Sequence, residues 1–201
     1  MSKINWILIG LVICLTTFVI VYVNKKVEYK DTYAQDRSMI EDLQARYMFA
    51  LDWQDPEAYA ATFTEDGTLD WAGGIVKGRE AIRGEVRAMR ANFAAQEAED
   101  VPLRPARLRH FITNVVVNIN DDKATGCAYW FEFNNRVPDR SGVSGNYGHY
   151  TDELRKVDGQ WLFSSRKIWN EAMDERAASM ENPVRQLIDH HTMPGDTMEG
   201  I

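Results

Sequence analysis

Hydrophobic positions form three kinds of pattern along the chain: one long apolar run, several helical stripes and several alternating segments. The long run, residues 4–23, contains no charged side chain. A helix needs roughly 20 such residues to cross a bilayer. Bulky residues and then Lys25 and Lys26 follow the run, whereas a cleavable signal peptide would end in small residues. We therefore expect an uncleaved membrane anchor over residues 1–26, with a signal sequence as the alternative.

The orientation of this expected anchor stays open. Lys3 precedes the apolar run, and Lys25, Lys26 and Lys30 follow it. This charge balance weakly favours a cytoplasmic domain, but an apolar segment at the extreme N-terminus also commonly directs the following chain across the membrane. The sequence predicts a single-pass membrane protein without fixing the side, and residues 27–35 are expected to be a polar tether.

Three segments have the three- and four-residue spacing of amphipathic helices. The first spans residues 36–53, where Ile40, Leu43 and Tyr47 share a stripe. Asp55-Pro56 should end it and start a second helix through Ala61, because Asp caps a helix and Pro suits its first turn. The third helix is expected over residues 78–96.

The remaining segments predict strands separated by turns. The expected turns are at residues 65–67, 73–74, 120–122 and 158–159, and the expected strands span residues 68–71, 109–117, 123–136, 147–157 and 160–169. Helices followed by mostly antiparallel strands predict one α+β domain, whose sheet curls over the helices. The last residues, 171–201, are expected to be a C-terminal tail or lid.

Alternation assigns the residues of two strands to faces. In the strand over 109–117 it places His110, Ile112, Asn114 and Val116 together, so His110 and Asn114 would be the polar groups of a cavity on that face. In the next strand it places four large or sulfur-bearing side chains on one face: Cys127, Tyr129, Phe131 and Phe133.

Composition narrows the functional classes. The net charge of −7 argues against nucleic acid as a partner, because phosphate binding needs a basic face. Cys14 lies in the apolar run and Cys127 in an expected strand, so we expect no disulfide. The chain has no glycine-rich phosphate loop, nucleophile elbow or zinc-ligand spacing, so we expect no cofactor and no metal.

His110 is the principal candidate for chemistry. A neutral imidazole is a useful base near pH 7, and a carboxylate bonded to its far nitrogen fixes the tautomer and supports the charge after proton uptake. Asp52 is one possible partner, but spacing alone does not bring positions 52 and 110 together; a satisfied histidine at a strand end is the simpler interpretation. His149 is expected to face solvent or a subunit contact, and His190 and His191 to be solvated.

Several short motifs follow one another in a characteristic order. They are Arg46-Tyr47, Ala50-Leu51-Asp52, Phe63-Thr64-Glu65-Asp66-Gly67, Arg109-His110-Phe111-Ile112-Thr113-Asn114, Tyr150 to Phe163, and Arg166. In this order the chain resembles the SnoaL-like branch of the nuclear transport factor 2-like superfamily over roughly residues 36–170. Within that branch it is similar to lindane dehydrochlorinase and, more remotely, to scytalone dehydratase.

The resemblance implies a fold and a site. The fold would be a cone-shaped curved antiparallel sheet wrapped around helices, also called a cystatin-like roll, preceded here by the expected transmembrane helix. Asp52 and His110 match the proton-abstracting dyad of both enzymes, and Arg166 matches the pocket arginine of the dehydrochlorinase. The expected substrate-binding residues are Tyr47, Leu69, Trp71, Asn114, Phe131, Phe133 and Tyr150.

Two positions depart from the enzymes that the chain resembles. Tyr47 stands where the dehydrochlorinase has a catalytic lysine, and Asn134 stands roughly where the dehydratase has a second histidine. The expectation is therefore a cofactor-independent lyase or isomerase acting on a small apolar or hydroxylated molecule. A non-catalytic binding or scaffolding domain is the alternative. In either case we expect a homo-oligomer, a dimer or trimer.

Overall fold

A computed structural model describes residues 32–99, 106–135 and 142–188 of the chain. The expected anchor, most of the tether, and His190 and His191 lie outside the described residues. Within the described ranges, no helix is long and apolar enough to cross a membrane. Contacts divide the chain into Met1–Tyr33 and Ala34–Ile201, and the fold below is that of the second unit.

Three helices precede most of the sheet, as the hydrophobic stripes predict. They are α2 (Tyr33–Asp52), α3 (Pro56–Ala61) and α4 (Arg79–Glu99). The Asp55 side chain accepts hydrogen bonds from the backbone N–H groups of Glu57 and Ala58, so it caps α3 as expected. The helix stripe of α2 is buried at Ile40, Leu43 and Tyr47.

Six strands of the described residues form one sheet. They are β1 (Phe63–Trp71), β2 (Gly74–Lys77), β3 (Leu108–Asn120), β4 (Lys123–Asn134), β5 (Tyr147–Val157) and β6 (Gln160–Asn170). Their order across the sheet is β2-β1-β6-β5-β4-β3. All neighbouring pairs are antiparallel except β1 and β6, which are parallel. The four long strands match the expected ones to within a few residues.

The structure corrects the expectation at the first strand. Residues 65–67 were expected to be a turn, but they lie inside β1, where the register against β6 shifts between Phe63 and Thr68. A bulge therefore absorbs the turn-favouring residues without ending the strand. The strand β2 (Gly74–Lys77) forms a tight antiparallel hairpin with β1, whereas the parallel β1–β6 pairing comes from residues distant in sequence, which local patterns do not report.

A second bulge corrects the faces of β3. The register against β4 shifts between Thr113 and Val116, and Asn114 has a φ of 55°. Because one residue is added, Val115 and Val117 turn to the inner side, where they contact or join the core, while Asn114 is exposed. The alternation expected from the sequence therefore holds before the bulge and reverses after it.

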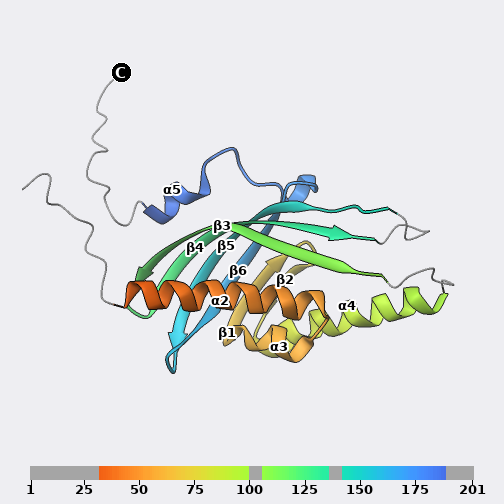
Figure 1. The fold of residues 1–201 in the computed structure, drawn as a ribbon, viewed down its shortest axis with the longest axis horizontal. Helices are drawn as coiled ribbons and strands as arrows, with labels where there is room; N and C mark the ends of the chain where they lie inside the picture. Colours follow the sequence, from red (N-terminus) through yellow and green to blue (C-terminus); the bar gives the residue numbers. More distant parts are fainter. Residues whose placement is uncertain (1–31, 100–105, 136–141, 189–201) are drawn as a thin grey trace, which may run out of the picture. The chain divides into compact units, whose positions relative to one another are not determined.

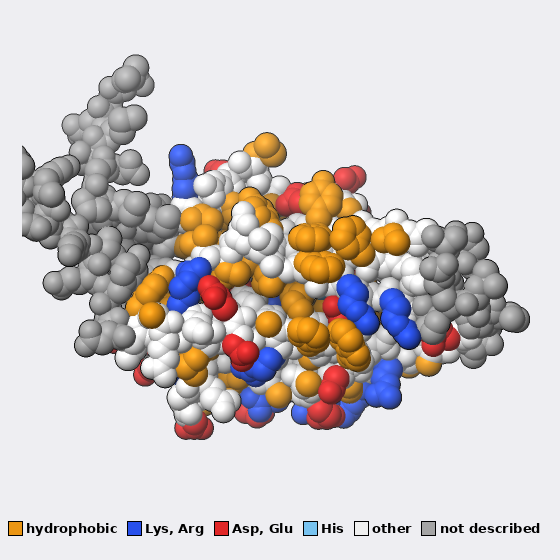
Figure 2. Space-filling model, in the orientation of Figure 1, with side chains coloured by type: hydrophobic (Ala, Val, Ile, Leu, Met, Phe, Trp, Pro, Cys, Tyr) orange, Lys and Arg blue, Asp and Glu red, His pale blue; other side chains and the backbone are white. Residues whose placement is uncertain are grey.

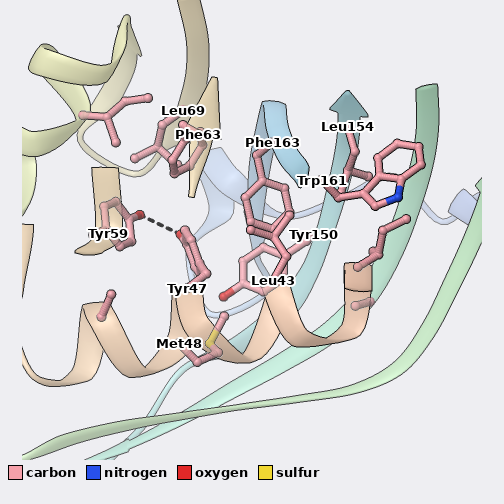
Figure 3. Close-up of a cluster of buried hydrophobic side chains, with 14 of the residues drawn as sticks. Leu43, Tyr47, Met48, Tyr59, Phe63, Leu69, Tyr150, Leu154, Trp161 and Phe163 are labelled. Carbon is pink, nitrogen blue, oxygen red and sulfur yellow. Dashed lines mark hydrogen bonds between the residues drawn. The ribbon is translucent and has the colours of Figure 1, made fainter. Parts of the chain in front are cut away.

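The helices α2, α3 and α4 cover one face of the sheet. In Figure 1, α2 lies across the strands, and a short helix, α5 (Pro183–Ile188), lies on the opposite side. The core between α2 and the sheet contains Leu43 and Tyr47 from the helix, with Phe63, Tyr150 and Phe163 from three strands (Figure 3). We call this side the inner face and the side that carries α5 the outer face. The C-terminal tail also contains a short 3-10 helix, Asp174–Arg176.

Candidate active site

The inner face of the sheet, with α2, α3 and α4, encloses a cavity of about 550 Å³. A cavity of this size suits a small molecule of a few rings. Most of its wall is apolar or aromatic, contributed by Leu51, Tyr59, Leu69, Trp71, Val86, Met89, Phe93, Leu108, Trp130, Ile168 and Met173 among others. Its polar groups include His110 and Glu132, which lie side by side on neighbouring strands.

Asp52 is the last residue of α2 and is only 8% exposed. A buried carboxylate at this helix end is unfavourable, because the last turn of a helix carries a partial negative charge. His110 at the start of β3 compensates from two directions. Its Nδ1 lies 2.6 Å from Oδ1 of Asp52, and its backbone N–H donates to Oδ2 over 2.8 Å. Both carboxylate oxygens thus hold one residue, which fixes the position of the imidazole ring.

Glu132 contacts the other nitrogen of the same ring. It is the direct partner of His110 in the β3–β4 ladder, and its Oε2 lies 3.1 Å from Nε2 of His110. Two side-chain amides orient its other oxygen: Asn146 donates to Oε1 over 2.8 Å and Asn134 over 3.2 Å. The site is therefore a carboxylate–imidazole–carboxylate arrangement, with Glu132 and His110 facing the cavity and Asp52 behind them.

The two carboxylates favour the protonated imidazole. Burial works against the charge, but the hydrogen bonds and negative charges of Asp52 and Glu132 outweigh it, so the pKa of His110 is raised above its ordinary value. Burial likewise works against the Glu132 carboxylate, but His110 and the two amide donors outweigh it and lower its pKa. The arrangement therefore stabilises an imidazolium between two carboxylates relative to a free histidine.

Aromatic side chains flank the site on both sides. Inside the cavity, Trp130 stacks against Tyr150 with ring centroids 5.9 Å apart, and its indole N–H donates to the backbone of Trp169. Outside, the guanidinium of Arg109 lies 3.9 Å from the ring centroid of Trp53, next in sequence to Asp52. The side chains of His110 and Asp52 are only 8% and 5% exposed, so water screens their electrostatic interaction weakly.

Arg166 lies beneath the cavity and does not line it. It is fully buried and binds Asp152 through two hydrogen bonds of 2.8 and 2.7 Å, and it also donates to Gln44. Its guanidinium is about equally close to the rings of Tyr47 and Tyr150, at 4.2 and 4.1 Å. Both tyrosines line the cavity, so Arg166 supports the cavity floor and does not contact a ligand directly.

A pair of tyrosines joins α2 to α3 at the cavity wall. The Tyr59 hydroxyl donates to the Tyr47 hydroxyl over 2.7 Å, as Figure 3 shows. Burial raises the pKa of both phenols above their ordinary value, although the charge of Arg166 works against the shift. Both phenols therefore stay neutral, and they can donate or accept hydrogen bonds.

The structure brings together six of the ten site residues expected from the sequence. Asp52 and His110 are in contact, and four expected binding residues line the cavity with His110: Tyr47, Leu69, Trp71 and Tyr150. The other four are corrections. Asn114 is turned outward by the bulge, Arg166 is paired below the floor, and Phe131 and Phe133 point to the outer face.

Phe131 and Phe133 were wrongly assigned to the cavity, and Glu132 was overlooked, for one and the same reason. Alternation correctly groups Phe131 with Phe133, but it does not say which face of β4 meets the helices. The inner face carries the alternate residues Trp130, Glu132 and Asn134, all of which line the cavity. Once His110 is assigned to the inner face, the β3–β4 register places Glu132 beside it on the same face. This register was the signal from which Glu132 could have been found.

Two further observations concern acidic and histidine side chains elsewhere in the described residues. Within the described ranges, no group of three or more His, Cys, Asp or Glu side chains could hold a metal ion. His149 is not solvent-facing: it is buried on the outer side, stacked on Trp169 at 5.8 Å and 3.6 Å from the Glu171 carboxylate.

The chain belongs to the SnoaL-like domain family, whose model matches residues 32–167. A protein of unknown function with a cystatin-like fold from Nostoc punctiforme is 34% identical, with a TM-score of 0.53, and the match covers 68% of this chain and 92% of that one. A variant of Rv3472 from Mycobacterium tuberculosis, also of unknown function, is 27% identical, with a TM-score of 0.60 and coverage of 80% and 88%.

A putative scytalone dehydratase from Novosphingobium aromaticivorans has the same fold. It is 24% identical, with a TM-score of 0.57, and the match covers 70% of this chain and 87% of that one. No curated protein sequence matches the chain. The resemblance drawn from the sequence motifs is therefore confirmed at the level of family and fold.

Proposed function

We propose that this SnoaL-like protein is a cofactor-independent lyase or isomerase that transfers a proton to or from a small, largely apolar molecule. The observation that carries the proposal is the two-point contact between Asp52 and His110 at the wall of an apolar cavity. A histidine held in this way is a typical proton-transfer group, because its tautomer and orientation are fixed before the substrate binds.

The cavity supports a substrate of fused or substituted rings. Trp130 and Tyr150 offer flat apolar surfaces, while the tyrosine pair and Asn146 offer hydrogen bonds to hydroxyl or carbonyl groups. A fold relative described as a putative scytalone dehydratase fits this class, and a 26% identical protein from Catenulispora acidiphila was solved in complex with S-DNPA.

The alternative is a binding domain without turnover. The observation that favours it is that both ring nitrogens of His110 are paired with carboxylates, which also describes a stable polar anchor in a cavity wall. The two proposals differ in whether a bound molecule is converted.

A panel of small hydroxylated and halogenated ring compounds separates the two proposals. The full-length chain is expected to convert at least one compound, and Asp52→Asn and His110→Gln should each lower the rate by about 100-fold, in the usual range for acid–base catalysis. His149→Gln is the matched control, because His149 is also buried and paired but lies on the outer face. Binding without conversion would support the alternative, and conversion that survives both substitutions would contradict the proposed mechanism.

We further propose that copies of the chain associate through the outer face as a dimer or trimer. Phe111, Tyr129, Phe133 and Tyr147 are exposed there, and Phe111 stacks on Phe131 with centroids 5.1 Å apart. Figure 2 shows groups of hydrophobic side chains at the surface of the domain. Sedimentation should show an oligomer that Phe133→Asp dissociates and Phe49→Asp, on the exposed side of α2, does not.

A further inference from the structure

The pairing of His110 limits which group at this site can take up a proton. Nδ1 faces Asp52 at 2.6 Å, and Nε2 faces Glu132 at 3.1 Å. A ring that donates from both nitrogens has no lone pair left. The histidine in this state is an acid, so a base must be found elsewhere on the cavity wall.

Glu132 is the neighbouring group with free acceptor capacity. Its side chain is 13% exposed and lines the cavity, whereas Asp52 lies behind the imidazole and has both oxygens bonded to His110. A carboxylate has about four lone-pair sites, and the contacts of His110, Asn134 and Asn146 occupy three. One site remains for a substrate hydrogen.

We propose that Glu132 is the base and His110 the acid of the reaction, which rests on the proposed function, and that Asp52 is a positioning residue. Glu132 takes a proton from a substrate carbon, and the electron pair of that C–H bond forms a new double bond. In an elimination, the bond from carbon to the leaving oxygen breaks; in an isomerisation, the carbonyl becomes an enol. In either case the leaving or enol oxygen takes the proton from Nε2 of His110. The proton on Glu132 then returns to Nε2 across the 3.1 Å contact, which restores the starting state.

This assignment defines a substrate class. Three hydrogen-bond donors make Glu132 a weak base, so it suits a carbon whose hydrogen is already acidic, next to a carbonyl or within an electron-poor ring. The oxygen to be protonated must lie within reach of the adjacent imidazolium. Hydroxylated ring ketones and related carbon acids satisfy both conditions.

The surroundings of His110 are mainly acidic or neutral. The titratable or charged groups that line its cavity or contact it are Tyr47 and Asp52 from α2, Tyr59 from α3, Glu85 from α4, Arg109 on β3 itself, Glu132 from β4 and Tyr150 from β5. Arg109 is the cation of this set, and it is occupied by Trp53 and by backbone carbonyls. The field at the ring therefore favours the protonated state that the proposal requires.

The test uses 5-nitrobenzisoxazole, a planar two-ring carbon acid that loses one proton and opens its N–O bond without needing an acid. With the full-length chain at pH 8, Glu132→Gln should lower kcat/KM by about 100-fold. His110→Gln should keep at least about a tenth of the rate, since the nitrophenolate leaves unaided. Glu171→Gln is the matched control, because Glu171 flanks the other buried histidine on the outer face, and its rate should be unchanged.

A second readout does not depend on turnover. In NMR titrations the pKa of His110 should fall in Glu132→Gln and stay unchanged in Glu171→Gln. An unchanged His110 titration in Glu132→Gln, or no elimination by the unmodified chain, would overturn the assignment. Loss of elimination in His110→Gln with retention in Glu132→Gln would also overturn it, while leaving His110 as the base in the proposed function. Failure of the proposed function itself would be seen as conversion of ring compounds that survives Asp52→Asn and His110→Gln.

Discussion

Asp52 shows how a single carboxylate can be kept at an unfavourable position when its partner is well placed. The carboxylate is buried and lies at the C-terminal end of a helix, which carries a partial negative charge. The backbone N–H and the ring of His110 pair with its two oxygens. The sequence identified this pair only through resemblance, since positions 52 and 110 share no local pattern. Glu132 could not be assigned in the same way, because its role depends on which face of β4 is buried.

The stability of the protein should depend on pH through His110 and Glu132. Because the pKa of His110 is raised in the folded state, its interactions stabilise the fold fully below the unfolded-state pKa of about 6.5. This stabilisation is lost as the pH rises through the folded-state pKa. Because the pKa of Glu132 is lowered in the folded state, its interactions stabilise the fold above the unfolded-state pKa of about 4.5. This stabilisation is lost as the pH falls through the folded-state pKa. The melting temperature of the unmodified chain should therefore exceed that of Glu132→Gln most between about pH 4.5 and 6.5. A difference that grows steadily above pH 8 would contradict the pairing.

Arg166 should contribute to folding more than to substrate contact. Arg166→Met leaves the buried Asp152 carboxylate without its partner, which is expected to cost about 3–5 kcal/mol in urea unfolding. Adding Asp152→Leu should recover much of the loss, because the uncompensated charge is then gone. Lys167→Met is the control: Lys167 is more exposed and 3.8 Å from Asp70, so a change within about 0.5 kcal/mol is expected. Full stability of Arg166→Met would contradict this role.

At the scale of elements, local patterns predict what depends on local physics. The stripe of α2, the Asp55 cap and the turn at residues 158–159 were all expected from the sequence and are present. Bulges were not expected, because adding one residue to a strand leaves hydrophobicity unchanged while it reverses the faces that follow. The positions of Asn114 and of residues 65–67 were therefore predicted incorrectly.

The bulge at Asn114 gives a prediction about backbone conformation. A positive φ suits glycine and asparagine but is strained for a β-branched residue. Asn114→Val should lower the free energy of unfolding by about 1–2 kcal/mol, whereas Asn114→Gly should be within about 0.5 kcal/mol of the unmodified chain. Thermal or urea unfolding measures both. Equal effects of valine and glycine would show that the bulge does not depend on this backbone conformation.

At the scale of the whole molecule, the order of the motifs predicted the family and the α+β fold, but the parallel pairing of β1 with β6 was not expected. This pairing joins residues about a hundred positions apart, and it places Leu69 and Trp71 at the cavity beside strands that follow much later. The membrane anchor that we propose over residues 1–26 rests on the sequence, where the uncharged apolar run of residues 4–23 is a strong signal in itself.

The proposed anchor predicts the behaviour of the expressed protein. After an alkaline carbonate wash, the chain should remain in the membrane fraction with an intact mass of 23.1 kDa. A released protein that has lost roughly the first 34 residues would show a cleaved signal sequence instead.

Proton transfer by the Asp52–His110–Glu132 site is the central claim, and deuterium exchange tests it most directly. The substrate is 2-tetralone, a fused two-ring ketone with an acidic carbon, and exchange at that carbon in D₂O is followed by NMR. The full-length chain should accelerate the exchange, and Asp52→Asn, His110→Gln and Glu132→Gln should each remove most of the acceleration, while His149→Gln should keep it. Exchange that is as fast in His110→Gln and Glu132→Gln as in the unmodified chain would contradict the claim.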